Sequence, residues 1–237
     1  MSDRQLRGVI FDMDGVIVDS HAVHRQAWRL FFATLDRQIP EAELDFILDG
    51  RKRDEILRHF LGDCQEPELE EFGRRKDCIF RQMHHEIAPV PGVVRLIHEL
   101  HRNGMVLALA TSASRSRARA TLIELGLLDC FRAVLTGEDV LLGKPDATIY
   151  RLARERCEIT ADRLLAVEDA ISGIRAAMGA GLGCLGVALH ESAGNLTAAG
   201  AIHVVHDFES VSVQDLEHIL QRRDFGVVAR QVGAGRA

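Results

Sequence analysis

The sequence is poor in aromatic residues and contains no long hydrophobic run. Its 237 residues include 10 Phe, 1 Trp and 1 Tyr, so aliphatic side chains must fill most of the interior. Because no apolar segment approaches the ~18 residues of a transmembrane helix, the sequence predicts no membrane span. The first residues also lack the apolar region of a signal peptide. We therefore expect neither a membrane anchor nor export.

Closely spaced cysteines and long basic runs are absent as well. The cysteines are odd in number and scattered, which excludes the paired spacing of a zinc site and suits a reducing compartment. The formal net charge is -6 at pH 7, so general affinity for nucleic acid or an anionic membrane is not expected. The expected location is the cytoplasm. The sequence does not reveal the oligomeric state, and a monomer is the default expectation.

Hydrophobic residues make up 47% of the chain, enough for a sizeable core, and they recur in a regular order. Short β-leaning runs alternate with segments that have the i, i+3, i+4 spacing of helices. This alternation predicts an α/β fold, a Rossmann-like parallel sheet with helices on both faces. Asp146 is expected to cap a helix over 147–156, and residues 231–237 resemble a frayed tail. The expected strands are 8–11, 105–111, 133–136, 164–167, 183–188 and 203–205.

One stretch, residues 20–87, interrupts the alternation because it shows helical periodicity and no good strand. Roughly 70 residues are too many for a loop in a compact domain. The stretch follows the first expected strand directly, at the end of the strand where open α/β folds bind ligands. We therefore predict an inserted α-helical cap domain over residues 20–87, and a core domain formed by residues 1–19 and 88–237.

Two carboxylates, Asp12 and Asp14, come just after the first expected strand. An Asp in this place can attack a phosphoryl group and become an aspartyl-phosphate, provided that a nearby cation offsets the charges. A second Asp two positions on can exchange a proton with the leaving or attacking oxygen. Gly15 then lets the chain turn sharply. Taken alone, an Asp-x-Asp after a strand is more often an ordinary acidic turn.

Polar side chains follow three more of the expected strands. Thr111 and Ser112 could hold phosphoryl oxygens together with backbone N–H groups, although a simple helix cap explains them equally well. Lys144 could neutralise a phosphate, whereas alone it would be an exposed loop lysine. Glu168 and Asp169 would meet the first Asp across neighbouring strand ends and form an oxygen-rich site suited to Mg²⁺. The alternative for this pair is a solvated helix start.

Four segments together resemble the haloacid dehalogenase superfamily, in its phosphatase and phosphomutase branch. They are Asp-Met-Asp-Gly-Val-Ile-Val-Asp at 12–19, Ala-Thr-Ser at 110–112, Gly-Lys-Pro-Asp at 143–146 and Val-Glu-Asp-Ala-Ile-Ser-Gly-Ile-Arg-Ala-Ala at 167–177. Each piece is common, but the four in this order are highly specific, and the likeness covers nearly the whole chain. The resemblance implies a Rossmann-like core, Mg²⁺ as cofactor and a phospho-aspartyl intermediate.

By that resemblance Asp12 is the nucleophile and a Mg²⁺ ligand. Asp14 is the general acid/base, and its backbone carbonyl is a further ligand of the metal. An acid at position 14 argues against dehalogenase chemistry, because the dehalogenases of the family lack one there.

The same resemblance divides the remaining core residues between phosphate and metal. Thr111 and Lys144, with the adjacent Ser112, hold the phosphoryl group. Asp169, with Glu168 close by, completes the metal site.

The helical stretch is similar to the small cap of β-phosphoglucomutase and of sugar-phosphate phosphatases. Arg53 matches a cap arginine that reads the substrate, and Lys76 matches a second basic position approximately. His24 could be a substrate or hinge group, or an ordinary polar helix residue, while Trp28 is expected in the cap core. Asp49 stands where β-phosphoglucomutases usually carry Lys, which weakens a mutase assignment.

The sequence therefore predicts an enzyme, a Mg²⁺-dependent phosphatase of a small phosphorylated metabolite, with a sugar phosphate as the expected substrate. An isomerase similar to β-phosphoglucomutase is the alternative, because nothing in the core separates the two reactions. A third hypothesis, a non-catalytic sugar-phosphate binding module, is disfavoured by the presence of both Asp12 and Asp14. The exact substrate cannot be read, because selectivity lies in a few cap residues.

Overall fold

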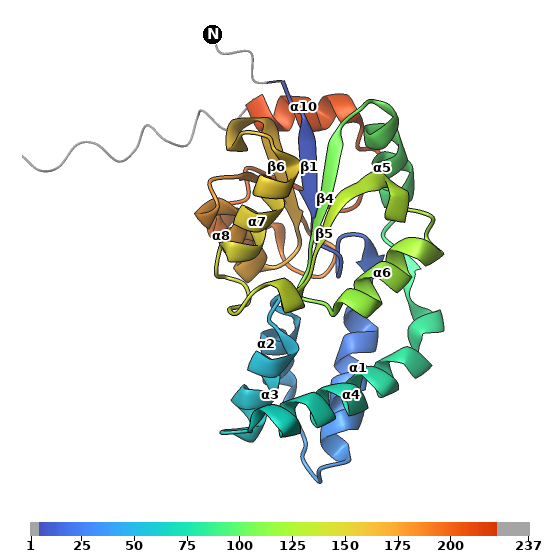
Figure 1. Cartoon of the computed structure of the whole chain (residues 1–237), viewed down its shortest axis with the longest axis vertical. Helices are drawn as coiled ribbons and strands as arrows, with labels where there is room; N and C mark the ends of the chain where they lie inside the picture. Colours follow the sequence, from blue (N-terminus) through green and yellow to red (C-terminus); the bar gives the residue numbers. More distant parts are fainter. Residues whose placement is uncertain (1–4, 222–237) are drawn as a thin grey trace, which may run out of the picture.

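A parallel β-sheet lies at the centre of the structure, a computed structural model that describes residues 5–221 (Figure 1). Its strands are β1 (Gly8–Phe11), β4 (Val106–Ala110), β5 (Phe131–Leu135), β6 (Leu164–Glu168), β7 (Gly183–Val187) and β8 (His203–Val205). Their order is β5-β4-β1-β6-β7-β8, and all neighbouring pairs are parallel. The expected strands are thus confirmed with slightly shifted bounds, while the tail expected at 231–237 lies outside the described residues.

Helices cover both faces of the sheet, which confirms the predicted α/β fold. They are α5 (Val93–Arg102), α6 (Arg115–Glu124), α7 (Thr148–Cys157), α8 (Ile171–Gly179), α9 (Ala193–Ala199) and α10 (Val213–Gln221). Residues of α5, α6 and α10 join one hydrophobic cluster, and residues of α7, α8 and α9 join a second. The two clusters lie on opposite faces of the sheet, because they take alternate residues of the same strand.

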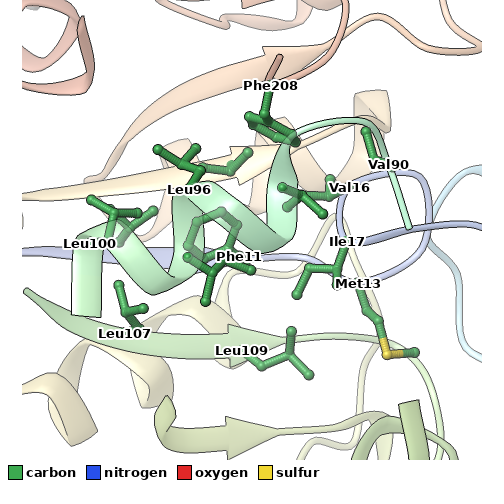
Figure 2. Packing of buried hydrophobic residues seen from close by; sticks show 14 of the residues in the cluster. Phe11, Met13, Val16, Ile17, Val90, Leu96, Leu100, Leu107, Leu109 and Phe208 are labelled. Carbon is green, nitrogen blue, oxygen red and sulfur yellow. The ribbon is translucent and has the colours of Figure 1, made fainter. Parts of the chain in front are cut away.

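That strand is β1, which lies between β4 and β6 in the middle of the sheet. Val9 and Phe11 belong to the first cluster, whereas Ile10 belongs to the second. A central strand covered on both faces is apolar throughout, and this explains the uninterrupted run of buried residues. Figure 2 shows Leu96 and Leu100 of α5 lying over Phe11. This packing holds β1 in place and thereby positions the residues that follow its last residue, Phe11.

Helix α7 begins one residue later than the sequence suggests. Ala147 has the backbone angles φ -80° and ψ -4° and precedes the first helical residue, Thr148. The carboxylate of Asp146 accepts a hydrogen bond of 2.8 Å from the backbone N–H of Thr148. Asp146 thus satisfies an N–H at the start of the helix, as predicted, but from one position further out.

A group of helices lies beyond the carboxyl ends of the strands (Figure 1). It consists of α1 (His21–Ala33), α2 (Leu44–Leu48), α3 (Arg53–Leu61) and α4 (Glu66–Gln82). Trp28, Phe31 and Phe32 lie at the centre of its own hydrophobic cluster, so the expectation that Trp28 is a core residue is confirmed. These helices can therefore pack on one another largely without the sheet.

Two short strands connect this helical group to the rest of the chain. They are β2 (Val18–Asp19) and β3 (Ala88–Pro89), which pair in antiparallel fashion. The chain therefore leaves the sheet region and returns to it at neighbouring points. Over the described residues, no helix is both long enough and apolar enough to span a bilayer.

Candidate active site

The polar residues predicted to follow the strands do meet at one edge of the sheet. Asp12 follows β1, Thr111 follows β4, and Asp169 follows β6, whose last residue is Glu168. Because β1 is hydrogen-bonded to both β4 and β6, these strand ends are neighbours. They line a cavity of about 230 Å³ that lies between the sheet and the helices of the helical group.

Lys144 connects the carboxylate of Asp12 to that of Glu168. Its Nζ lies 2.7 Å from Asp12 Oδ1 and 2.6 Å from Glu168 Oε1. The Tyr150 hydroxyl donates a further hydrogen bond of 2.7 Å to Glu168. Lys144 is 1% exposed, so the expectation of a solvated loop lysine is excluded. Burial disfavours its charged form, but Asp12 and Glu168 outweigh this effect and raise the pKa of Lys144.

Asp12, Glu168 and Asp169 form a group that fits a divalent cation. Each offers a carboxylate oxygen, these oxygens lie within 4.8 Å of one another, and all three residues are buried. Burial raises the pKa of Asp12 to about 7, and it raises the pKa of Glu168 and Asp169 as well. When ionised, these three carboxylates carry more negative charge than one lysine ammonium can neutralise. A buried set of oxygen donors of this kind is suited to Mg²⁺. The residues present thus fit the predicted cofactor.

The carboxylate of Asp14 has other partners than that of Asp12. Arg117 donates two hydrogen bonds to the Asp14 carboxylate, at 2.8 and 2.5 Å, and the Ser20 hydroxyl donates a third at 2.5 Å. His24 Nε2 lies 3.5 Å away. Burial alone would raise the pKa of Asp14, but the two bonds from Arg117 outweigh it and hold that pKa well below its usual range. In the geometry of this structure Asp14 is therefore a carboxylate anion.

The comparisons with known proteins agree with this geometry. A family model described as haloacid dehalogenase-like hydrolase matches residues 6–181. The chain belongs to this family. Hexitol phosphatase A from Escherichia coli (strain K12) is 30% identical over 207 residues, 87% of this chain and 94% of that protein. Beta-phosphoglucomutase from Bacillus subtilis (strain 168) is 30% identical over 192 residues, 77% of this chain and 83% of that protein.

Solved structures extend the likeness to the fold. The crystal structure of a variant of CbbY from Rhodobacter sphaeroides in complex with xylulose-(1,5)bisphosphate has a TM-score of 0.77 and 29% identity. The match covers 90% of this chain and 100% of that chain. The family, the fold and the enzyme class predicted from the motifs are thus confirmed: this chain is a haloacid dehalogenase-like hydrolase.

The helical group of this hydrolase brings basic residues to the cavity. His24, Arg53 and Lys76, all singled out in the sequence, line it. Lys76 is 4% exposed; its Nζ lies 3.3 Å from His24 Nδ1 and 4.7 Å from the centre of the Phe80 ring. Burial lowers the pKa of Lys76 to about 7, and burial together with Lys76 lowers the pKa of His24 to about 3. His24 is thus a neutral pocket residue rather than a surface one.

The two hydroxyl residues after β4 have different surroundings, although both line the cavity of the hydrolase. Thr111 Oγ1 accepts a hydrogen bond of 3.1 Å from the Ala113 N–H, which leaves its own hydroxyl hydrogen available to a ligand. Ser112 Oγ donates a bond of 2.5 Å to the carbonyl of Gly50, in the loop before α3. The Ser112 side chain therefore fastens the helical group to the sheet in this structure.

More bonds of the same kind fasten the loop before α3 to the sheet side of the hydrolase. Asp49 Oδ1 accepts a bond of 2.9 Å from the Ser172 N–H. Lys52 Nζ donates a bond of 2.7 Å to the Val140 carbonyl. Glu55, in the first turn of α3, accepts a hydrogen bond of 2.8 Å from the backbone N–H of Gly143. The helical group is thus docked over the cavity.

Arg117 and His21, which both line the cavity, were not predicted from the sequence. Arg117 lies in the first turn of α6, where a cation faces the positive end of the helix dipole, and this unfavourable placement was the available signal. His21 opens α1 and lies 2.9 Å from Asp169. Burial lowers the pKa of His21, but the hydrogen bond to Asp169 outweighs it, so the pKa is raised. No local sequence pattern indicated that contact.

Proposed function

We propose that this hydrolase is a Mg²⁺-dependent phosphatase of small phosphorylated metabolites and that its substrates are sugar phosphates. One observation carries the proposal. The Asp12 carboxylate lies buried at the end of the central strand, 2.7 Å from the ammonium of Lys144 and in one group with the carboxylates of Glu168 and Asp169. A nucleophile in this place can attack phosphorus while a lysine and a cation offset the charge of a phosphate.

The reaction would run in two displacements. In the first, an Asp12 oxygen forms a bond to phosphorus while the bond from phosphorus to the ester oxygen breaks, and Asp14 protonates that oxygen. In the second, Asp14 takes a proton from water, whose oxygen attacks phosphorus and releases Asp12 and inorganic phosphate. Because the bonds from Arg117 keep Asp14 ionised, substrate binding must loosen them before Asp14 can carry a proton.

The other residues have supporting roles in this proposal. Asp12, Glu168, Asp169 and the backbone carbonyl of Asp14 would hold Mg²⁺, which offsets phosphoryl charge when bound. Thr111 and Lys144 would bind the phosphoryl oxygens, with Ser112 beside them.

The division of the chain into domains belongs to the same proposal. Residues 20–87 would be a cap domain that selects the leaving group, placed on a core domain of residues 1–19 and 88–237. Closing of the cap would exclude bulk water from the cavity, and the bonds between the loop before α3 and the sheet side would be those of the closed form.

The relatives support a phosphorylated sugar or polyol as substrate. One is a hexitol phosphatase, and CbbY has been crystallised with a bisphosphate of xylulose. The likeness to a β-phosphoglucomutase favours the second candidate, an isomerase that returns the phosphoryl group to a sugar hydroxyl. The two differ only in whether water or a sugar accepts the phosphoryl group from Asp12.

A panel of phosphorylated sugars, polyols and short-chain metabolites would test the proposal. Released phosphate should be measured for each compound, beside an assay for isomerisation of β-glucose 1-phosphate. Phosphate release from at least one compound with high kcat/KM is the expected result. Isomerisation without phosphate release would replace the phosphatase by the mutase, and binding without either reaction would indicate a non-catalytic module.

Arg53 gives a prediction about selectivity. Its side chain lines the cavity and donates a bond of 2.9 Å to Asp77, and its guanidinium lies so close to Gly73 that a Cβ there would overlap it. We expect Arg53→Ala to raise KM and to lower kcat/KM for the best substrate about tenfold to a thousandfold, or ~1.4–4 kcal/mol. A small generic phosphate ester, which cannot reach the helical group, should lose much less.

Arg58→Ala is the matched control for this prediction. Arg58 lies on the same helix, is exposed, and pairs with the exposed Glu66 at 2.8 Å. Its removal should leave both substrates unaffected. Steady-state kinetics with both esters would decide: equal losses for Arg53→Ala on the two substrates, or no loss on either, would contradict a role in substrate selection.

A further inference from the structure

His21 lies against the metal-site residue Asp169 although it belongs to the helical group. It is the first residue of α1, it is 9% exposed, and its Nε2 lies 2.9 Å from Asp169 Oδ2. The chain reaches it directly from β2, the strand that leads out of the sheet region. A side chain from the start of the helical group therefore contacts a carboxylate at the end of β6.

A second histidine holds the His21 ring in place. The ring of His190 is stacked on that of His21, with 4.6 Å between the ring centres and an angle of 22° between the planes. His190 follows β7, and its Nε2 lies 2.6 Å from Asp19 Oδ1 in β2. The His21 ring is thus covered by a ring that is itself fixed to the strand preceding α1.

The backbone at Gly15 lies against both His21 and Asp169. Gly15 has a φ of +75°, and a Cβ there would overlap the Asp169 carboxylate and come within 2.9 Å of His21 Nε2. The imidazole and the carboxylate therefore rest directly on the turn after Asp14. Between this turn and the His190 ring, His21 has little freedom to rotate away from Asp169.

We propose that His21 is a positioning residue for Asp169 and sets the affinity of the site for Mg²⁺. The N–H of His21 donates to Oδ2 of Asp169, which would fix the rotation of the carboxylate and leave Oδ1 available to a cation. Partners of this kind behind a ligand typically change metal affinity 10- to 100-fold when they are removed. The inference rests on the metal site of the proposed function.

Titration of the full-length protein with MgCl₂ alone, measured by isothermal titration calorimetry, tests this role without any substrate. His21→Phe keeps a ring that can stack on His190 but removes the donor, and it should weaken Mg²⁺ binding 10- to 100-fold. His21→Gln keeps an N–H donor and should bind within a few-fold of the wild type. His85→Phe, at an exposed histidine far along the chain, is the matched control and should change nothing.

A purely structural role would give a different pattern. It would lower the melting temperature of the metal-free protein for His21→Phe and His21→Gln alike, and the two would bind Mg²⁺ equally. Unchanged or tighter Mg²⁺ binding by folded His21→Phe would overturn the proposal. If His21→Phe does not fold, His190→Ala replaces it, because the donor then stays but its ring is no longer covered. A three- to tenfold weakening is expected there, and no weakening would overturn the proposal.

The same titration separates this inference from the proposed function. Wild-type protein that binds Mg²⁺ but releases no phosphate from any ester would refute the phosphatase and leave the role of His21 standing. Wild-type protein that hydrolyses esters and binds Mg²⁺ no better than His21→Phe would refute the role of His21 alone. Wild-type protein that binds no Mg²⁺ would refute both.

Discussion

Asp12→Asn should abolish turnover and leave the fold intact. An amide is a poor nucleophile and a poor Mg²⁺ ligand, so the first displacement loses its attacking group, and we expect kcat to fall at least about a thousandfold. The amide oxygen can still accept the hydrogen bond that Asp12 accepts from Lys144 at 2.7 Å. Because burial raises the pKa of Asp12 to about 7, ionised Asp12 is disfavoured in the fold. The melting temperature of the metal-free variant should therefore equal or exceed that of the wild type.

Initial rates and circular dichroism measure the two halves of this prediction. Asp63→Asn, at an exposed position in the helical group, is the matched control and should keep full activity. Acid-quenched wild-type enzyme should also retain labelled phosphate from a labelled substrate, and Asp12→Asn should retain none. Activity above about a tenth of the wild-type rate in Asp12→Asn would rule out Asp12 as the nucleophile.

Removal of divalent cations should have an effect of similar size. Asp12, Glu168 and Asp169 place three buried carboxylates where a substrate phosphate would add further negative charge. In the described structure the Lys144 ammonium is the cation that lies within hydrogen-bond distance of two of them. Without a divalent cation the phosphate would meet uncompensated repulsion, so activity should vanish after exhaustive dialysis against chelator and return when Mg²⁺ is added.

A chelator presaturated with Mg²⁺ is the control for this experiment, because it separates removal of the cation from inhibition by the chelator itself. Phosphate release under saturating substrate is the measurement. Full activity in metal-free chelator after dialysis would exclude these carboxylates as an essential metal site. Activity restored only by a softer transition metal would keep the site and correct the identity of the cofactor.

The residues at the carboxyl edge of the sheet could be predicted from the sequence, because each of them follows a pattern of neighbouring residues that marks the end of a strand. Asp12, Thr111 and Asp169 each follow a short apolar run, and the carboxyl ends of parallel strands must lie at one edge. Lys144 does not follow its strand directly, because β5 ends at Leu135. Its place at the edge was expected only because it could neutralise a phosphate and because its motif resembles that of the family.

Contacts across the boundary with the helical group could not be predicted in the same way. Ser112 meets Gly50 only because the helical group docks in one particular orientation over the sheet. That orientation is set by many weak contacts between residues far apart in the chain. It therefore cannot be predicted from helical periodicity. The stacking of His21 on His190 has the same origin, since the two are brought together from the start of α1 and from the segment after β7.

The pairing of β2 with β3 also bears on how such enzymes can diverge. Val18 faces Pro89 and Asp19 faces Ala88, so the two ends of the helical group are joined side by side. A segment with adjacent ends can be exchanged for another of different length without stretching the rest of the chain. If the helical group selects the substrate as proposed, recombination at these two points would transplant a relative's substrate preference onto an unaltered Asp12, Lys144 and acidic cluster. New specificities would then arise by exchange of a cassette rather than by rebuilding of the chemistry.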